Sequence, residues 1–126
     1  MPIQTNSQKM AQTAHQRIQD RKTPQQKLVK EFTSFARSFP SLIHACGLAQ
    51  AVAFAEARAA KSRPHGEYLE DLAAVLSAVG YSDAATPGAL ACATRESTVL
   101  PYLRLSRDAL AAAGWLKRYV EAAAPE

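Results

Sequence analysis

The C-terminal part of the chain contains the sequence YLRLSRDALAAAGWLKRY, which runs from Tyr102 to Tyr119. At about 100° of rotation per residue, its large apolar side chains and several alanines fall on one side of a helix. The side predicted to face a protein core consists of Tyr102, Leu105, Ala109, Ala112, Leu116, Tyr119 and the following Val120. The stretch therefore predicts a long amphipathic α-helix, which we expect to begin at Ser97 or Thr98 and to reach about Ala123.

The opposite side of this predicted helix is positively charged. Arg104, Arg107 and Arg118 share it with Asp108, Ala111 and Trp115, while Lys117 is displaced toward Leu103 and Leu110. Guanidinium groups form bidentate contacts with phosphate, and an indole offers a flat surface to a base, so this face suits single-stranded nucleic acid. A solvated helix face, with Trp115 packed under a neighbouring helix or subunit, is the simpler interpretation. This helix alone leaves both interpretations open.

Composition extends the helical prediction to the whole chain. The 126 residues include 26 alanines but only five glycines, and alanine has the highest helix propensity of all residue types. A chain of this length is typical of one domain, which we expect to span residues 1–126. We predict an all-α fold, a compact bundle of about six helices near residues 6–22, 24–39, 42–61, 67–79, 87–95 and 97–123.

Helix starts and stops follow recognisable residues. Asn6 or Ser7 is expected to cap the first helix, and the segment 23–26 has the pattern of a capping box with proline at the first helical position. Pro40 is expected to interrupt the second helix, so that Ser41 caps the third. Residues 62–66 resemble a loop, and Gly80 is the expected end of the fourth helix.

Two further expectations concern what these helices bury and expose. The predicted core includes Met10, Ala14 and Ile18 in the first helix and Leu28, Phe32, Phe35 and Phe39 in the second. The acids Glu67, Glu70 and Asp71 are expected in the first turn of the fourth helix, where they would complement its macrodipole.

The charges divide unevenly along the chain. The formal net charge is +4, but residues 1–63 carry +7 and residues 64–126 carry −3. A second set of candidate RNA contacts lies in the basic half and consists of Arg17, Arg21, Lys22 and Arg37. Such a division suits an anionic partner on one side, or head-to-tail contact between copies, although cations of this kind commonly serve only solubility.

Recognisable signals of catalysis are missing from the sequence. It contains no phosphate-binding glycine loop and no His-Glu-x-x-His motif, and its three histidines are scattered. Cys46 and Cys92 have no second cysteine at zinc-ligand spacing and are interpreted as small buried thiols. We therefore expect a non-enzymatic, cytoplasmic protein that binds no metal or cofactor and does not span a membrane.

Two stretches together resemble a known family. FPSLIHACGLAQAVAF, from Phe39 to Phe54, and YLRLSRDALAAAGWLKRY are similar to motifs of the small subunit of the Cmr complex, a type III-B CRISPR effector. Phe39, Val52 and Ser106 stand where the family usually has Leu, Leu and Thr.

The resemblance implies a fold and a role. It implies a helical bundle whose copies stack into a filament beside the repeating backbone subunit. This filament would lie next to CRISPR RNA and single-stranded target RNA, and cleavage would be carried out by other Cmr subunits. Arg104, Arg107, Lys117 and Arg118 match basic positions of the C-terminal motif and become the foremost RNA candidates. Pro40, Gly47 and Gln50 match the other motif and imply a helix break, a close approach and a polar contact. The alternatives are a helical protein–protein adaptor and a DNA-binding regulator.

Overall fold

The computed structural model describes residues 3–22 and 28–123. This part of the chain consists of helices joined by short connections and contains no β-strand, which confirms the predicted all-α fold. Its elements are α1 (Asn6–Arg21), α2 (Lys30–Ala59), α3 (Arg63–Ala78), the short 3-10 turn η1 (Ser82–Ala84), α4 (Pro87–Glu96) and α5 (Val99–Ala123).

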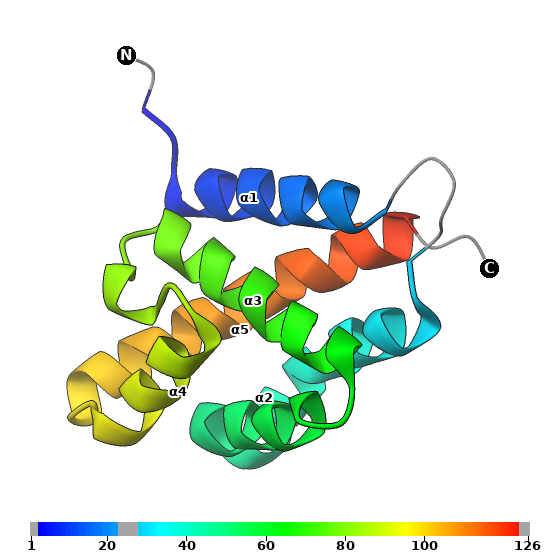
Figure 1. Cartoon of the computed structure of the whole chain (residues 1–126). Helices are drawn as coiled ribbons and strands as arrows, with labels where there is room; N and C mark the ends of the chain where they lie inside the picture. The colour runs from blue at the N-terminus through cyan, green and yellow to red at the C-terminus, as the bar shows by residue number, and fades with distance from the viewer. Residues whose placement is uncertain (1–2, 23–27, 124–126) are drawn as a thin grey trace.

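The helices surround one continuous hydrophobic core. α1 lies along α3 and α5, while α2 packs against the same two helices, and α4 with η1 covers the remaining end (Figure 1). The predicted core face of α5 is confirmed, since Leu105, Ala109, Ala112, Leu116 and Val120 are all buried. The basic residues of α5 are thereby turned away from the core.

The first helix follows its predicted pattern with a different cap. Met10, Ala14 and Ile18 are buried, as predicted. The cap is Thr5 rather than Asn6 or Ser7: its side chain accepts a hydrogen bond from the backbone N–H of Gln8, whose side chain accepts one from the Thr5 N–H. This reciprocal pairing satisfies two backbone donors and fixes the start of the helix. The capping box predicted at residues 23–26 lies outside the described residues.

The interruption predicted at Pro40 is wrong. Helix α2 continues through Pro40, because Phe39 and Ile43 are buried on either side of it and their packing holds the backbone helical despite the missing N–H. The change of direction occurs at Gly47, with φ 84° and ψ 163°. The predicted second and third helices are therefore two stretches of one kinked element, which explains why five α-helices are described rather than six.

Helix α2 is also long and apolar enough, by length and composition alone, to cross a membrane, with a mean hydropathy of 1.3 over its most apolar window. The core helix of a compact protein passes the same test. Its large apolar residues Phe32, Phe39, Leu48 and Val52 are buried against other helices. A third of this window is buried in the fold, and the exposed positions of α2 are mostly alanine, serine and charged residues.

The start of the fourth predicted helix is also corrected. Residues 62–66 do not form a loop, because α3 begins at Arg63 and accommodates Pro64 in its first turn, where no backbone donor is lost. The end of this helix is confirmed at Gly80, whose φ of 106° suits glycine. Thr86 caps α4, since its side chain accepts a hydrogen bond from the Ala89 N–H at 3.1 Å.

Candidate nucleic-acid interface

A row of exposed cations follows the outer side of α5. Arg104, Arg107 and Arg118 are exposed, and Lys117 is half-buried beside them. Because an α-helix rises about 1.5 Å per residue, the row is roughly 21 Å long from Arg104 to Arg118. The buried opposite side holds the helix in place, so the backbone positions from which these cations project are set by the fold.

Trp115 is partly exposed, which lies between the two positions that the sequence left open. Its indole is half-buried, packs against the core, and stacks on the Tyr119 ring with centroids 5.9 Å apart and planes 18° apart. Tyr119 in turn meets the edge of His15 on α1 at 5.2 Å. The indole therefore belongs partly to the seam between α1 and α5, and the arginines are more exposed than the indole.

Asp108 directly follows Arg107 in sequence, but its side chain is only 19% exposed. Tyr81 Oη, just before η1, donates to Asp108 Oδ2 at 2.6 Å, and Arg107 Nε donates to the other carboxylate oxygen at 3.4 Å. Burial and the hydrogen bond to Asp108 raise the pKa of Tyr81 to about 12. The sequence did not reveal this hydrogen bond between Tyr81 and Asp108. Because it holds the carboxylate toward Tyr81, the exposed charge on the outer side of α5 comes mainly from the arginines.

Arg37 of α2 joins the C-terminal end of this row. Its Nε lies 3.6 Å from a carboxylate oxygen of Glu121 on α5. Next to that pair, a hollow of about 360 Å³ is lined by Pro40, Leu110, Gly114, Lys117, Arg118 and Glu121. The fold therefore brings Arg37, Lys117 and Arg118 together although α2 and α5 are far apart in sequence. We refer to Arg104, Arg107, Lys117, Arg118 and Arg37 as the α5 basic face.

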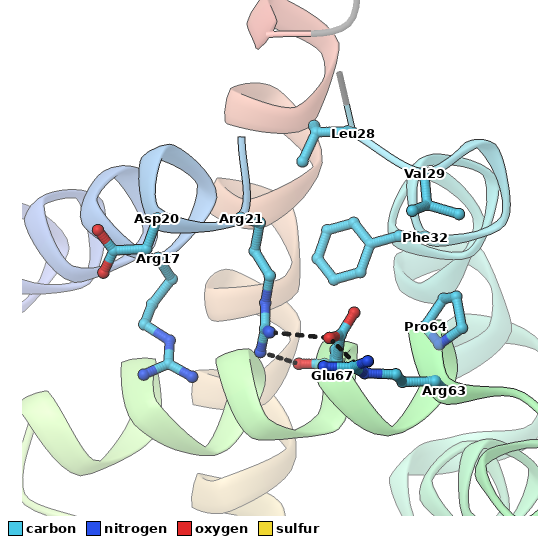
Figure 2. Close-up of a pocket in the computed structure, with 9 residues that line it drawn as sticks. All are labelled: Arg17, Asp20, Arg21, Leu28, Val29, Phe32, Arg63, Pro64 and Glu67. Atoms are coloured by element: carbon cyan, nitrogen blue, oxygen red, sulfur yellow. Dashed lines mark hydrogen bonds and ion pairs between the residues drawn. The ribbon is translucent and has the colours of Figure 1, made fainter. Parts of the chain in front are cut away.

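Two other candidate residues are engaged inside the protein. Arg17 Nε donates to Asp71 Oδ1 at 2.8 Å, and Arg21 Nε donates to Asp71 Oδ2 at 3.1 Å. Arg21 also donates to Glu70 and to the backbone oxygen of Glu67. Figure 2 shows both arginines reaching from α1 toward α3, with Glu67 between Arg21 and Arg63. These guanidinium groups join two helices.

Asp71 explains this arrangement. Its side chain is completely buried and is surrounded by α1 and α3. Burial raises the pKa of the Asp71 carboxyl, while the two guanidinium groups oppose that shift. Burial lowers the pKa of Arg21, but the hydrogen bonds and charges of Asp71, Glu70 and Glu67 together raise it above the ordinary value. The macrodipole role predicted for Glu67, Glu70 and Asp71 is wrong, because α3 begins four residues before Glu67 and these acids contact Arg21 instead.

The remaining expectations concern single residues. Lys22 is exposed immediately after the last residue of α1, and α1 carries no residue of the α5 basic face. Gly47 is required for its φ rather than for a close approach, since a Cβ there would lie 3.8 Å from Tyr102 Oη, an ordinary contact. Gln50 is exposed, and Cys46 and Cys92 are half-buried free thiols.

Comparison with known proteins identifies the family. Residues 6–123 match the family of CRISPR-associated proteins designated Cas_Cmr5. The chain is 38% identical over 120 residues to the CRISPR system Cmr subunit Cmr5 of Thermus thermophilus, covering 95% of this chain and 96% of that protein. It is also similar to the crystal structure of a CRISPR-associated Cmr5 family protein from the same species, with a TM-score of 0.84, 36% identity, and coverage of 98% and 100% of the two chains. The chain therefore belongs to the Cmr5 family of CRISPR-associated proteins.

Proposed function

We propose that this protein is a non-catalytic structural subunit of a type III-B Cmr ribonucleoprotein and contacts guide or target RNA through the α5 basic face. Membership of the Cmr5 family supports the assembly, and the name of the Thermus thermophilus relative assigns that protein to a Cmr system. The observation that carries the RNA contact is the exposed row formed by Arg104, Arg107 and Arg118 on a rigid helix.

The chemistry of this row suits a backbone rather than a base sequence. In RNA-guided complexes, base pairing supplies the sequence information, so protein subunits need only charge and shape. Among the described residues, no carboxylate forms an ion pair with Arg104 or Arg118, and the Arg107 side chain is 73% exposed beside Asp108. Their guanidinium groups therefore remain accessible to phosphate oxygens.

The other candidate RNA contacts differ in whether their side chains are free to bind phosphate. Arg37 and Lys117 extend the α5 basic face, and Lys22 is a more remote candidate. Arg17 and Arg21 are already bound to Asp71, so we assign them a role in holding α1 against α3. RNA that displaced them would leave a buried carboxylate unpaired, which costs several kcal/mol.

The partners that we propose are the other Cmr subunits in the cytoplasm, chiefly the repeating backbone subunit, and further copies of this chain stacked as a filament. Three large apolar side chains at the start of α5 support a protein contact: Val99, Leu100 and Leu103 are 71%, 70% and 57% exposed. Exposed apolar groups clustered on one helix end are typical of interaction surfaces.

A salt series on the assembled complex tests the RNA contact. We compare wild type with Arg104→Ala/Arg107→Ala/Arg118→Ala, and with the control Lys9→Ala/Lys61→Ala/Arg95→Ala, which removes the same charge from α1, the end of α2 and α4. If the three arginines bind phosphate, the slope of log affinity against log salt falls by about 0.7 per lost contact, and the control keeps the wild-type slope.

The second candidate function is a protein–protein adaptor without RNA contact, which the exposed Val99, Leu100 and Leu103 favour. It predicts an unchanged slope in the arginine variant with intact assembly. A complex that no longer assembles with this variant would show that the α5 basic face is a subunit interface, and would also contradict the RNA proposal.

A further inference from the structure

The kink at Gly47 creates an open groove on the side of α2 that is turned away from α5. The N-terminal stretch of α2, its C-terminal stretch and the start of α3 enclose about 730 Å³. Its wall consists of Lys30, Glu31, Ser34, Phe35, Ser38, Ser41, Leu42, Ala45, Phe54, Arg58 and His65. Binding sites for small organic groups commonly have this size, an apolar floor and a few polar groups at the rim.

The floor of the groove is aromatic. The Phe54 ring is 41% exposed although it is large and apolar, and its plane lies within 18° of the buried Phe35 ring at 6.4 Å between centroids. The guanidinium carbon of Arg58 lies 4.9 Å from the Phe54 centroid, and the His65 ring lies 4.4 Å from Phe35. An exposed ring paired with a guanidinium group is the combination on which nucleic-acid bases stack.

The rim is cationic and rich in hydroxyl groups. Lys30 and Arg58 are exposed, and within the described residues neither forms an ion pair. The one acid of the lining, Glu31, accepts a hydrogen bond from Ser62 Oγ at 3.2 Å. Ser34, Ser38 and Ser41 are exposed along the same side of α2, although the Ser38 hydroxyl already donates to the Phe35 backbone oxygen at 3.1 Å.

This rim distinguishes between possible occupants. An apolar helix from a partner would bury two cations and three hydroxyls against hydrocarbon, and polar groups buried without partners are costly. A nucleotide has a flat base for the aromatic floor, polar base edges for the hydroxyls and a phosphate for Lys30 or Arg58. The charge and the chemistry of the groove therefore favour a nucleotide over an apolar segment.

We propose that the α2 groove binds one unstacked base of single-stranded RNA, with the base replacing the Arg58 guanidinium on the face of Phe54 and its phosphate held by the displaced Arg58 or by Lys30. This inference rests on the proposed function, because it requires RNA to be present on the protein. The groove and Arg37 lie on different sides of the same stretch of α2, which is about 10 Å in diameter, so a strand that leaves the α5 basic face has a short path to the groove.

The test combines protein and RNA changes in the assembled complex. Phe54→Leu keeps an apolar side chain but removes the ring, Phe54→Tyr keeps the ring, and Val29→Ala changes an exposed apolar residue outside the groove. Each complex is titrated with an RNA oligomer and with versions that carry an abasic site at successive positions. Stacking on an aromatic side chain predicts at least about fivefold weaker binding for Phe54→Leu, with Phe54→Tyr and Val29→Ala close to wild type.

The abasic series shows whether Phe54 and one particular base act together in binding. At one position of the RNA, loss of the base weakens binding to wild type but has no further effect on Phe54→Leu.

Arg58→Gln provides a second variant and is expected to weaken binding and to reduce the salt slope. The groove proposal is overturned if Phe54→Leu and Arg58→Gln bind RNA like wild type while the α5 arginine variant is impaired, or if Phe54→Leu instead prevents subunit assembly. If the wild-type complex shows no dependence on the α5 arginines, the proposed function itself fails, which is a separate result.

Discussion

The phenolic oxygen of Tyr102 accepts a hydrogen bond from the backbone N–H of Ala49 at 3.0 Å. Ala49 lies two residues beyond the kink at Gly47, where the helical hydrogen-bond pattern of α2 restarts and its first N–H groups have no partner within the helix. A side chain from α5 thus caps the second stretch of α2. The bond joins the two sequence stretches that carry the family resemblance, and it holds the wall of the groove against the helix that carries the basic face.

Tyr102→Phe tests this tertiary cap. Removal of the hydroxyl leaves the Ala49 N–H without its acceptor while the ring remains in place. We expect the free energy of unfolding to fall by about 1–2 kcal/mol, measured by urea denaturation. Tyr119→Phe, on the same helix, is the control and is expected to have little effect. Equal stability of Tyr102→Phe and wild type would show that the cap contributes nothing.

Gly47→Ala tests the kink itself. With φ 84° and ψ 163°, Gly47 occupies a backbone region that is almost exclusive to glycine, and alanine there costs about 1–3 kcal/mol. Gly114→Ala is the matched control, because Gly114 lies inside α5 with nothing within 4 Å of an added Cβ. Alanine favours helix over glycine, so this control is expected to be up to about 1 kcal/mol more stable than wild type. Thermal unfolding of the two variants should therefore shift in opposite directions, and a Gly47→Ala protein as stable as wild type would contradict the account of the kink.

The buried carboxylate between α1 and α3 predicts a larger effect. Asp71→Asn leaves Arg17 and Arg21 facing each other without their shared counter-charge. We expect a loss of about 2–4 kcal/mol in the free energy of unfolding, less than for a fully enclosed pair because both guanidinium groups reach solvent. Glu70→Gln removes an exposed partner of Arg21 and should cost less than about 1 kcal/mol. Similar losses for the two variants would argue against a special role for Asp71.

How far the sequence predicts this fold can be judged from particular residues. The buried sides of α1 and α5 follow from helical periodicity, which depends only on local spacing, and both are confirmed. The sequence predicts the kink at Pro40, because proline is the usual local signal for a break in a helix. The actual position at Gly47 depends on the packing of Phe39 and Ile43 against other helices and on backbone conformation, neither of which is visible in the sequence.

The candidate site shows the same division. The exposure of Arg104, Arg107 and Arg118 follows from the periodicity of one helix. The ion pairs of Arg17 and Arg21 do not follow from local periodicity, because Asp71 is 50 residues or more away and only the tertiary fold brings it to them. In retrospect, basic residues four apart on one helix and acids three and four apart on another were a signal for such a pairing.

Tyr81 provides a prediction for alkaline pH. Its pKa is raised from the ordinary value of 10.0 to about 12, first by burial and then by its hydrogen bond to Asp108. The native state therefore keeps this proton after the unfolded state has lost it, and stability falls as pH rises from about 10 through the folded pKa. Tyr81→Phe should show a weaker decline over this range than wild type. Urea denaturation at several alkaline pH values measures the difference, and parallel curves for the two proteins would contradict the shift.

The position of RNA along α5 is most directly measured by photo-crosslinking in the assembled complex. The RNA carries 4-thiouridine at successive positions, and the crosslinked peptides are identified by mass spectrometry. The account predicts crosslinks in this subunit concentrated between Tyr102 and Tyr119, and lost in the Arg104→Ala/Arg107→Ala/Arg118→Ala variant. Crosslinks confined to other parts of this chain or to other subunits, with α5 unmodified in the wild-type complex, would contradict it.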